Sequence, residues 1–477
     1  MTKHTFMNDV LRQDLSKIPS DTTELSFEVD FNQTIKVGEL PPYLKKMTLP
    51  VGFNSEIELG AIPEGLEEID FGYSYDLKIA TGLLPKGIKK IILPSFFSCR
   101  PLKHGLEIGS IPDGTEEIKF GISYDHPITM GLLPSSIKKL ELPGRFDQEL
   151  TTGLIPDGVE EINFGHTFNH PILPGVLPRS LKKIYLSSNF DRMMKIGSIP
   201  EGVEEIKFGH KYSHPIFPGL LPKSIKKFAI DFNRKLEIGS IPGGTEEIDF
   251  GCNFNQYIAP GLLPRSLKKI SLLNGPGTGL TTGSIPEGVE ELNIVRYIHP
   301  IAPEAFPKSL KVFAVDHCEI PIEQVFIPDS VEEVNIGYAF NHSIVPGLLP
   351  KNIKRLILGN LFKNKLEEGS VPDGLQEIEL NLMLNGTIEN IPRTAKIMSK
   401  YHIPDAKYTL ICSEDQLNYY KSELGDKCKF GEAYSYRNYS AVDVEPIKKT
   451  INVDYKVLES IEKTISALRQ EIDRLKQ

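Results

Sequence analysis

Apolar residues recur along this chain with a period close to 22 residues. The period is marked by an apolar residue followed by proline, which occurs 18 times between Ile18-Pro19 and Ile391-Pro392. Most intervals are 22 residues, a few are 20 or 21, and one is 27. Such regular spacing identifies a repeat, and each unit repeats the same internal order of apolar and polar positions.

Positions are counted here from the proline of each dipeptide, which is position zero. Positions three, six and eight are apolar, and positions six and eight alternate with polar neighbours, as in Glu161-Ile162-Asn163-Phe164. This alternation predicts a short strand with one buried face. One short strand cannot bury its own apolar face, so successive units must stack into a solenoid with a continuous core.

The segment that returns to the next strand contains helix-breaking residues. In the unit after Pro156 it reads His170-Pro171-Ile172-Leu173-Pro174-Gly175. Two prolines and a glycine disfavour a helix, so we expect an extended outer face. The apolar spacing is that of leucine-rich repeats. We therefore expect a mainly β, leucine-rich-repeat-like solenoid of about 17–18 coils of 22 residues, with one short parallel strand per coil.

The units are of two alternating kinds, which differ in charge at positions four and five. One kind has two glutamates there, as in Glu160-Glu161, and the next has two lysines, as in Lys182-Lys183. Stacking in register would place opposite charges side by side, and each such contact stabilises a sheet by roughly 0.2–1 kcal/mol. The alternation is therefore either a lock on strand register or a charged stripe that recruits a partner.

An aromatic residue at position twelve and an Asn or Asp after it recur in most units. We expect the rings to form a second stack in the core, and the polar side chains to satisfy backbone amides at a turn. The aromatic residues are Phe31, Phe53, Tyr75, Phe146, Phe168, Phe190, Phe254 and Phe340. Their polar neighbours are Asn32, Asn54, Asp76, Asp147, Asn169, Asp191, Asn255 and Asn341.

Four histidines recur at position fourteen, namely His126, His170, His214 and His342. Equivalent positions would lie two coils apart, or roughly 10 Å, which is too far for the ligands of one zinc ion. We therefore expect these histidines to stabilise turns. No catalytic motif interrupts the repeat, so we predict no enzyme, no metal site and no cofactor.

Residues that depart from the repeat are better candidates for binding a partner. The 27-residue interval contains an insertion around Phe96 and Arg100, and the units from Pro286 to Pro328 lose the charge pattern around Arg296 and His317. Position seven, on the exposed face of the strand, varies most and is aromatic at Tyr185. These five residues are the candidate partner contacts, although drift of the repeat explains the departures equally well.

The repeat ends near residue 392. We expect a cap segment over 1–17, the solenoid over 18–392, a small α/β cap over 393–439, a linker over 440–452 and an amphipathic helix over 453–477. The cap should contain a strand over 407–412 and a helix from Ser413. The last segment has an apolar seam with alternating spacings of three and four residues: Leu458, Ile461, Ile465, Leu468, Ile472 and Leu475. This seam predicts a coiled coil between copies, or alternatively a helix that packs back on the solenoid.

Composition narrows the classes of function. The net charge is −9, so the chain has no excess of basic residues with which to bind nucleic acid. No apolar stretch is long enough for a transmembrane helix or a signal peptide, so no membrane partner is expected. The five cysteines are widely spaced, which favours a reducing, cytoplasmic compartment over a disulfide-linked fold.

Phe168-Asn169-His170-Pro171-Ile172, in 22-residue units punctuated by Ile-Pro, resembles the FNIP repeat. This relative of leucine-rich repeats is abundant in slime-mould and giant-virus proteins. The resemblance implies a protein-interaction repeat without catalytic residues, in the cytoplasm of the cell or of a virus's host. Some relatives carry an F-box that links them to ubiquitin ligases, but only 17 residues precede the first Ile-Pro here. We expect an interaction scaffold, and alternatively a structural component of a particle or fibre.

Overall fold

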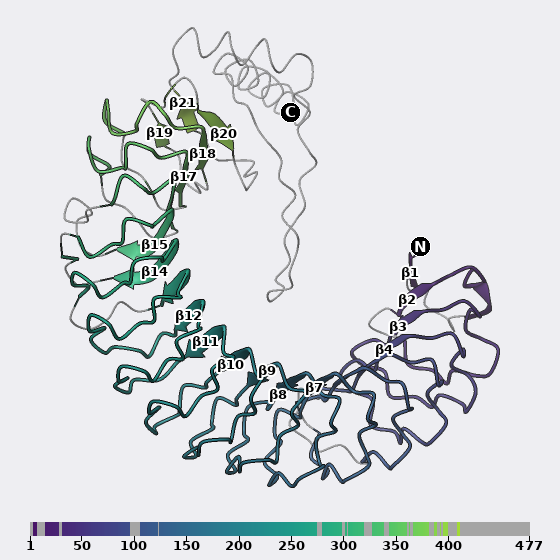
Figure 1. Ribbon diagram of the computed structural model, residues 1–477. Helices are drawn as coiled ribbons and strands as arrows, with labels where there is room; N and C mark the ends of the chain where they lie inside the picture. Colours follow the sequence, from purple (N-terminus) through teal and green to yellow (C-terminus); the bar gives the residue numbers. More distant parts are fainter. Residues whose placement is uncertain are drawn as a thin grey trace, which may run out of the picture. The chain divides into compact units, whose positions relative to one another are not determined.

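Figure 1 shows the computed structural model of residues 1–477. The chain divides into two compact units, residues 1–248 and 249–477, and each is described by itself. The described residues are 3–6, 15–27, 31–95, 105–122, 124–273, 279–297, 301–302, 304–318, 327–337, 343–359, 362, 366–380, 386–388, 392, 395–398 and 408–410. Within them, no helix has the length and apolar character needed to cross a membrane.

The first unit is a ladder of parallel strands, with one strand in each coil. Each strand pairs in register with its neighbours in the preceding and following coils, as Glu161 does with Lys139 and Lys183. The strands are β1 (Lys3–Phe6), β2 (Glu24–Phe27), β3 (Lys46–Thr48), β4 (Glu68–Asp70), β5 (Lys90–Ile92), β6 (Glu117–Lys119), β7 (Lys139–Glu141), β8 (Glu161–Asn163), β9 (Lys183–Tyr185), β10 (Glu205–Lys207) and β11 (Lys227–Ile230). Strand β12 (Glu247–Phe250) contains the boundary between the units.

The second unit continues the same strand pattern with longer strands. Its ladder consists of β13 (Lys269–Leu272), β14 (Glu291–Tyr297), β15 (Val312–Cys318), β16 (Glu333–Ile336), β17 (Arg355–Leu358), β18 (Glu377–Leu380) and β20 (Lys396–Met398). Strands β19 (Gly386–Ile388) and β21 (Tyr408–Leu410) form a separate parallel pair. The 3-10 turn η1 (Leu15–Lys17) is the one helical segment among the described residues, as the prolines and glycines of the return segment predict.

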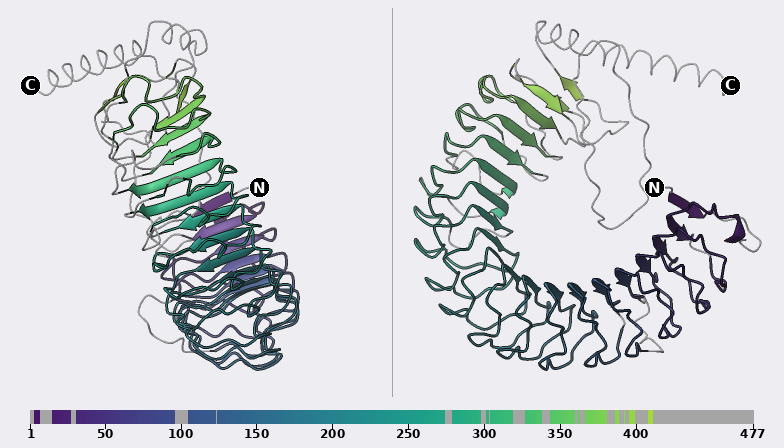
Figure 2. Two further views of the ribbon diagram at one scale, coloured as in Figure 1. Left: turned by 60° about the vertical axis from the view of Figure 1, so that its left-hand side comes forward. Right: turned by 45° about the vertical axis from the view of Figure 1, so that its right-hand side comes forward.

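The buried positions are those that the repeat predicts. Val159, Ile162 and Phe164, at positions three, six and eight, have no exposed surface. Strand residues alternate between the core and the opposite face, so Glu161 and Asn163 are partly exposed beside them. In both units the strands lie side by side along the inner side of the curve, and turns and loops form the outer side (Figure 2). The expected parallel, leucine-rich-repeat-like solenoid is therefore confirmed.

The position-twelve rings form the expected stack. The ring centroid of Phe168 lies 5.8 Å from that of Phe146 and 6.0 Å from that of Phe190, and the planes of Phe168 and Phe190 differ by 2°. Phe190 continues the stack to Tyr212 at 6.0 Å. Each coil thus contacts its neighbours through an aromatic layer as well as through the strand.

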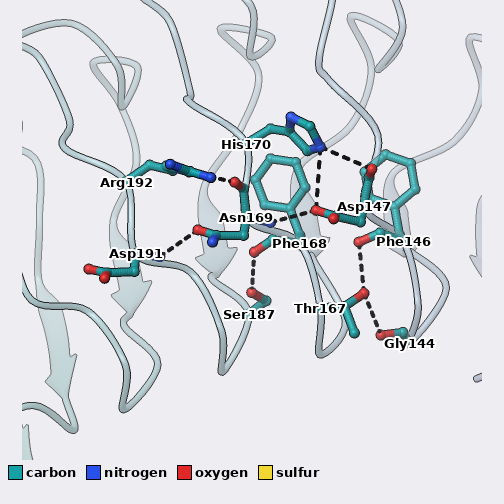
Figure 3. Close-up of polar contacts among 10 residues, drawn as sticks. All are labelled: Gly144, Phe146, Asp147, Thr167, Phe168, Asn169, His170, Ser187, Asp191 and Arg192. Atoms are coloured by element: carbon teal, nitrogen blue, oxygen red, sulfur yellow. Dashed lines mark hydrogen bonds and ion pairs between the residues drawn. The ribbon is translucent and has the colours of Figure 1, made fainter.

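Beside this stack, the position-thirteen side chains form a ladder of hydrogen bonds between coils (Figure 3). The Asn169 backbone amide donates to Asp147 Oδ1 at 3.0 Å, and the Asp191 amide donates to Asn169 Oδ1 at 2.9 Å. The amide of Ser213 continues the ladder to Asp191 at 2.8 Å. These side chains accept from turn amides, as expected, but each amide belongs to the following coil, so the bond holds two coils in register.

The position-fourteen histidines in this region also bridge coils. His170 Nε2 lies 3.0 Å from the Asp147 carbonyl oxygen, to which it must donate, and 3.4 Å from Asp147 Oδ1. His214 Nε2 makes the same contact with the Asp191 carbonyl oxygen at 3.3 Å. Among the described residues no three His, Cys, Asp or Glu side chains are grouped to hold a metal ion. The geometry therefore agrees with the structural role expected from the sequence, whereas His342 lies outside the described residues.

Several expectations for the C-terminal part concern residues that the structure does not describe. Strand β21 lies within the predicted strand over 407–412. The expected cap helix from Ser413, the linker over 440–452 and the seam from Leu458 to Leu475 lie outside the described residues. The proposed domain boundaries remain predictions.

Candidate recognition surface

The inner face is defined here as the side chains at positions five and seven of the strands. These side chains point away from the core because strand residues alternate between the two faces of a sheet. On β8 and β9, for example, Asn163 and Tyr185 are partly exposed, whereas the residues directly before and after each of them are buried in the core. The inner face is the continuous strand surface on the inner side of each unit (Figure 2).

Charged residues at position five form a column of ion pairs along the inner face. Lys183 Nζ lies 3.9 Å from a Glu161 carboxylate oxygen and 3.8 Å from one of Glu205. Lys227 Nζ lies 2.9 Å from Glu247 Oε1, and its hydrogen bond to that carboxylate raises the pKa of Lys227. Opposite charges therefore abut between coils, as the sequence alternation predicts.

A second column of ion pairs runs through the more exposed position four. Lys45 Nζ lies 2.7 Å from Glu67 Oε1, and Glu116 lies between Lys89 at 3.3 Å and Lys138 at 3.4 Å. Hydrogen bonds from Lys89 and Lys138 hold the pKa of the Glu116 carboxyl below its usual value. Within each column the opposite charges of successive coils pair with each other, which supports the register-lock interpretation over a charged stripe open to a partner.

Position seven carries a different side chain in almost every coil. In the first unit, Lys119 and Glu141 form an ion pair at 3.0 Å on β6 and β7. Asp70 accepts a hydrogen bond from the Gly72 amide at 2.8 Å, and burial raises the pKa of its carboxyl. Asn163 accepts from the Gly165 amide in the same way, at 3.0 Å. The strand therefore presents variable side chains on an invariant backbone frame.

Tyr185 is the aromatic side chain that the sequence singles out at position seven, and the structure holds it in a defined orientation. Its hydroxyl donates a hydrogen bond to Glu205 Oε1 on the next strand at 2.9 Å. Burial, together with the neighbouring Glu205 carboxylate, raises the pKa of Tyr185, so the phenol keeps the proton that it donates. The strand register places Asn163 and Lys207 on its two sides.

In the second unit the column of position-five charges is interrupted at β15. Val312 occupies the position between Glu291 and Glu333, where the alternation predicts a basic residue. Glu291 instead pairs with Lys269 at 2.7 Å on its other side. This interruption lies in the units from Pro286 to Pro328, where the sequence already shows that the charge pattern is lost.

Two strands on, Arg355 bridges three carboxylates. Its guanidinium lies 3.4 Å from Glu333, 3.6 Å from Glu377 and 2.8 Å from Glu379. The contact with Glu379 joins a position-five charge to a position-seven charge. Arginine suits this role because its planar fork of donors can serve several acceptors at once.

The structure brings together only part of the predicted set of partner contacts. Tyr185 lies on the inner face as expected. The backbones of Arg296 and His317 pair in register on β14 and β15, the two longest strands among the described residues, so the two residues are neighbours in the sheet. Phe96 and Arg100 lie outside the described residues, as do the seam residues. The β-branched and aromatic residues over 291–297 and 312–318, among them Ile294, Val295 and Tyr297 in the first segment, are the signal that could have predicted the seven-residue strands.

Comparison with known proteins assigns the repeat to a family. The family described as FNIP Repeat matches residues 53–96, 104–144, 146–189, 190–230, 232–274 and 340–382, which is more than half of the chain. A comparison with curated proteins found none that matches.

Among solved structures, the chain is similar to the giant-virus protein CroV588, described as a novel circular LRR protein structure. The identity is 23% and the TM-score 0.60, over 83% of this chain and 66% of CroV588, so this chain spans slightly less than two thirds of that protein. A structure of a TLR13–ssRNA13 complex matches at 15% identity and a TM-score of 0.49, over 82% of this chain and 68% of that one. A structure of the Toll–Spatzle complex from Drosophila matches at 13% identity and a TM-score of 0.45, over 84% and 59%. The likeness to CroV588 supports the leucine-rich-repeat-like fold.

Proposed function

Since the chain belongs to the FNIP repeat family, we propose that it is a non-enzymatic scaffold that binds a protein partner on its inner face. The observation that carries the proposal is the contrast between fixed and variable positions on the strands. Positions six and eight are buried and apolar throughout, while position seven changes from coil to coil on the same backbone frame. Variable side chains on a fixed scaffold are what specific recognition of a partner requires.

The electrostatics of the inner face favour a protein surface as the partner. Its position-five glutamates and lysines already neutralise one another along the ladder. A surface with matched charges attracts a polyanion weakly, because binding to phosphates depends on unpaired basic residues. Recognition then depends on shape and on the pattern of position-seven side chains, as in protein–protein interfaces.

We place the centre of the contact at Tyr185. Tyrosine is enriched among residues that dominate binding energy, because it combines a large apolar ring with a hydrogen-bonding hydroxyl. The bond to Glu205 fixes the ring before a partner arrives, so less side-chain entropy is lost on binding. Asn163 and Lys207 on the neighbouring strands add polar contacts beside it.

Capture experiments with the full chain test this proposal. Proximity labelling or pull-down with the wild type is compared with Tyr185→Ala, and with Tyr43→Ala as a matched control because Tyr43 is 67% exposed and lies outside the strands. Loss of a hot-spot residue costs about 2 kcal/mol or more, or roughly thirtyfold in affinity. The same partner should be recovered with the wild type and Tyr43→Ala and lost with Tyr185→Ala. Equal recovery with all three proteins would contradict binding at this face.

The C-terminal seam supplies the second part of the proposal, which is self-association. Six apolar residues from Leu458 to Leu475 at alternating spacings of three and four residues would make one apolar face of a helix. Joining copies would raise the avidity of the inner face for a partner that presents several sites. Sedimentation of the full chain is compared with that of a chain ending near Val442. Equal monomeric masses would remove the self-association claim.

A further inference from the structure

A second exposed surface, unrelated to the inner face, runs along an outer turn of the first unit. We call it the turn ridge. It consists of the residue that precedes a glycine in the outer turn of ten successive coils: Val37, Leu59, Thr81, Ile108, Met130, Thr152, Pro174, Ile196, Pro218 and Ile238. The six large aliphatic residues among them are 61–70% exposed. None of the ten is charged, although the residue just before is charged in five coils: Lys36, Glu58, Glu107, Lys195 and Glu237.

The conformation of the turn does not explain these aliphatic residues. In one coil the Leu132 amide donates to the Thr129 carbonyl oxygen at 3.1 Å, and Gly131 has a φ of 83°. A positive φ at the third residue of such a turn requires glycine there, and proline is favoured at the second residue. The turn therefore accounts for Gly131 and for Pro174 and Pro218. Threonine also occurs at the second residue of this turn, as Thr81 and Thr152, so the turn conformation does not require an exposed isoleucine, leucine or methionine there.

From Val37 to Met130 the side chains of the turn ridge form a continuous strip from coil to coil. Ile108 Cδ1 lies 3.9 Å from the place that a β-carbon on Gly131 would occupy, and Met130 Cε lies 3.8 Å from the equivalent place on Gly153. Within this stretch each side chain lies over the glycine of the next coil, whereas no side chain lies within 4 Å of the equivalent place on Gly175 or Gly219. The result is an apolar strip one residue wide on a part of the fold that is otherwise open to water. An exposed, contiguous apolar surface of this kind marks an interaction site.

We propose that the turn ridge binds residues 453–477 of a second copy of this chain. The seam from Leu458 to Leu475 would be about 25 Å long as a helix. Four coil steps from Val37 to Met130, at the 5.8–6.0 Å between stacked rings of successive coils, give roughly 24 Å. The seam therefore matches the continuous part of the ridge, from Val37 to Met130, in apolar character and in length. This inference rests on the proposed self-association and names the surface that the seam contacts.

The area available indicates a reciprocal dimer. A helix about 25 Å long that covers a strip about 10 Å wide hides roughly 250 Å² on each side, or about 500 Å² in total. One such contact is below the roughly 1,000 Å² of a specific interface, and two equivalent contacts reach it. The seam of each copy would therefore bind the turn ridge of the other copy, in a closed dimer with twofold symmetry. The seams would then not face each other as a coiled coil.

Sedimentation of the full chain and three variants tests the inference. The ridge variant carries Leu59→Lys and Met130→Lys, and the seam variant carries Ile465→Lys and Leu468→Lys. The control carries Val51→Lys and Ile122→Lys, which introduce the same charges at exposed apolar residues off the ridge in the same unit. We expect dimers of the wild type and the control, and a dimer affinity at least tenfold weaker for the ridge and seam variants. A mixture of the ridge and seam variants keeps one intact contact, between the seam of the ridge variant and the ridge of the seam variant, so it should associate more strongly than either variant alone and more weakly than the wild type. A circular dichroism spectrum and a urea midpoint like those of the wild type show that each variant is folded.

The outcomes separate the two claims. A wild type that is monomeric at all concentrations would overturn self-association and the ridge contact together. A ridge variant that dimerises like the wild type, while the seam variant does not, would overturn the ridge contact and leave a seam-to-seam coiled coil. A mixture of the two variants that associates no more strongly than either variant alone would also overturn the reciprocal contact.

Discussion

Truncation of Phe168 should destabilise the first unit more than any exposed substitution, because this ring connects three layers of the core. Phe168 is fully buried, and its ring lies 4.6 Å from Phe164, 5.8 Å from Phe146 and 6.0 Å from Phe190. Removing a buried phenylalanine side chain costs about 3–5 kcal/mol through lost burial and the cavity left behind. The three aromatic contacts, at about 0.5–1.5 kcal/mol each, are part of that cost and place Phe168 near its upper end. We therefore expect Phe168→Ala to lower the free energy of unfolding by about 4–5 kcal/mol.

Urea titration followed by circular dichroism measures this loss, and native-state hydrogen exchange locates it. Because each coil contacts only its neighbours, exchange should accelerate most on β7, β8 and β9. Phe168→Leu, which fills most of the space, should lose about 1–2 kcal/mol. Met193→Ala is a control at a 60% exposed site and should change stability by less than about 0.5 kcal/mol. Equal effects of Phe168→Ala and Met193→Ala would refute the layered core.

Two further predictions concern the polar contacts between coils. Asn169→Ala removes the acceptor of the Asp191 amide and should cost about 1–3 kcal/mol in urea titration, whereas Asn169→Asp keeps the oxygen and should cost less; equal losses would contradict the ladder. Hydrogen bonds from Lys89 and Lys138 lower the pKa of the Glu116 carboxyl in the folded state below the ordinary value of 4.5. The ionised carboxylate therefore stabilises the fold at pH values above 4.5, and this stabilisation is lost as the pH falls through the pKa of the folded state. The difference in unfolding free energy between the wild type and Glu116→Gln should therefore shrink between about pH 6 and about pH 3, and a difference that stays constant would contradict the pairing.

The order of apolar and polar positions in the repeat unit predicts most of the fold, because every coil needs the same kinds of residue at the same positions. Alternation at Ile162 and Phe164 defines the strand and its buried face, and stacking of identical units leaves one register in which Glu161 meets Lys139 and Lys183. The position-twelve ring stack follows for the same reason. A period in sequence becomes a period in space, so a property read from one unit holds for its neighbours.

Other features depend on contacts between coils that no single unit reveals. The acceptor role of Asn169 was predictable, but its partner is the amide of Asp191 in the next coil, which the sequence of one unit does not show. The turn ridge was missed because its aliphatic residues are interrupted by Thr81, Thr152 and two prolines, so they show no strict pattern. The orientation of Tyr185 toward Glu205 depends on a side-chain rotamer, which residue spacing does not fix.

The contact between opposite charges of successive coils is the central feature of this solenoid. A double-mutant cycle that reverses the charges of Glu161 and Lys183 tests it directly. Glu161→Lys and Lys183→Glu each turn two attractive neighbour contacts into repulsive ones, and each should lower the free energy of unfolding by on the order of 1 kcal/mol at low salt. In the double variant the 161–183 pair is attractive again, while the contacts with Lys139 and Glu205 become repulsive. The account therefore predicts a double variant no less stable than either single variant, with all three differences reduced in 1 M salt. Additive losses, with the double variant twice as destabilised, would show that these residues are not neighbours and would contradict stacking in register.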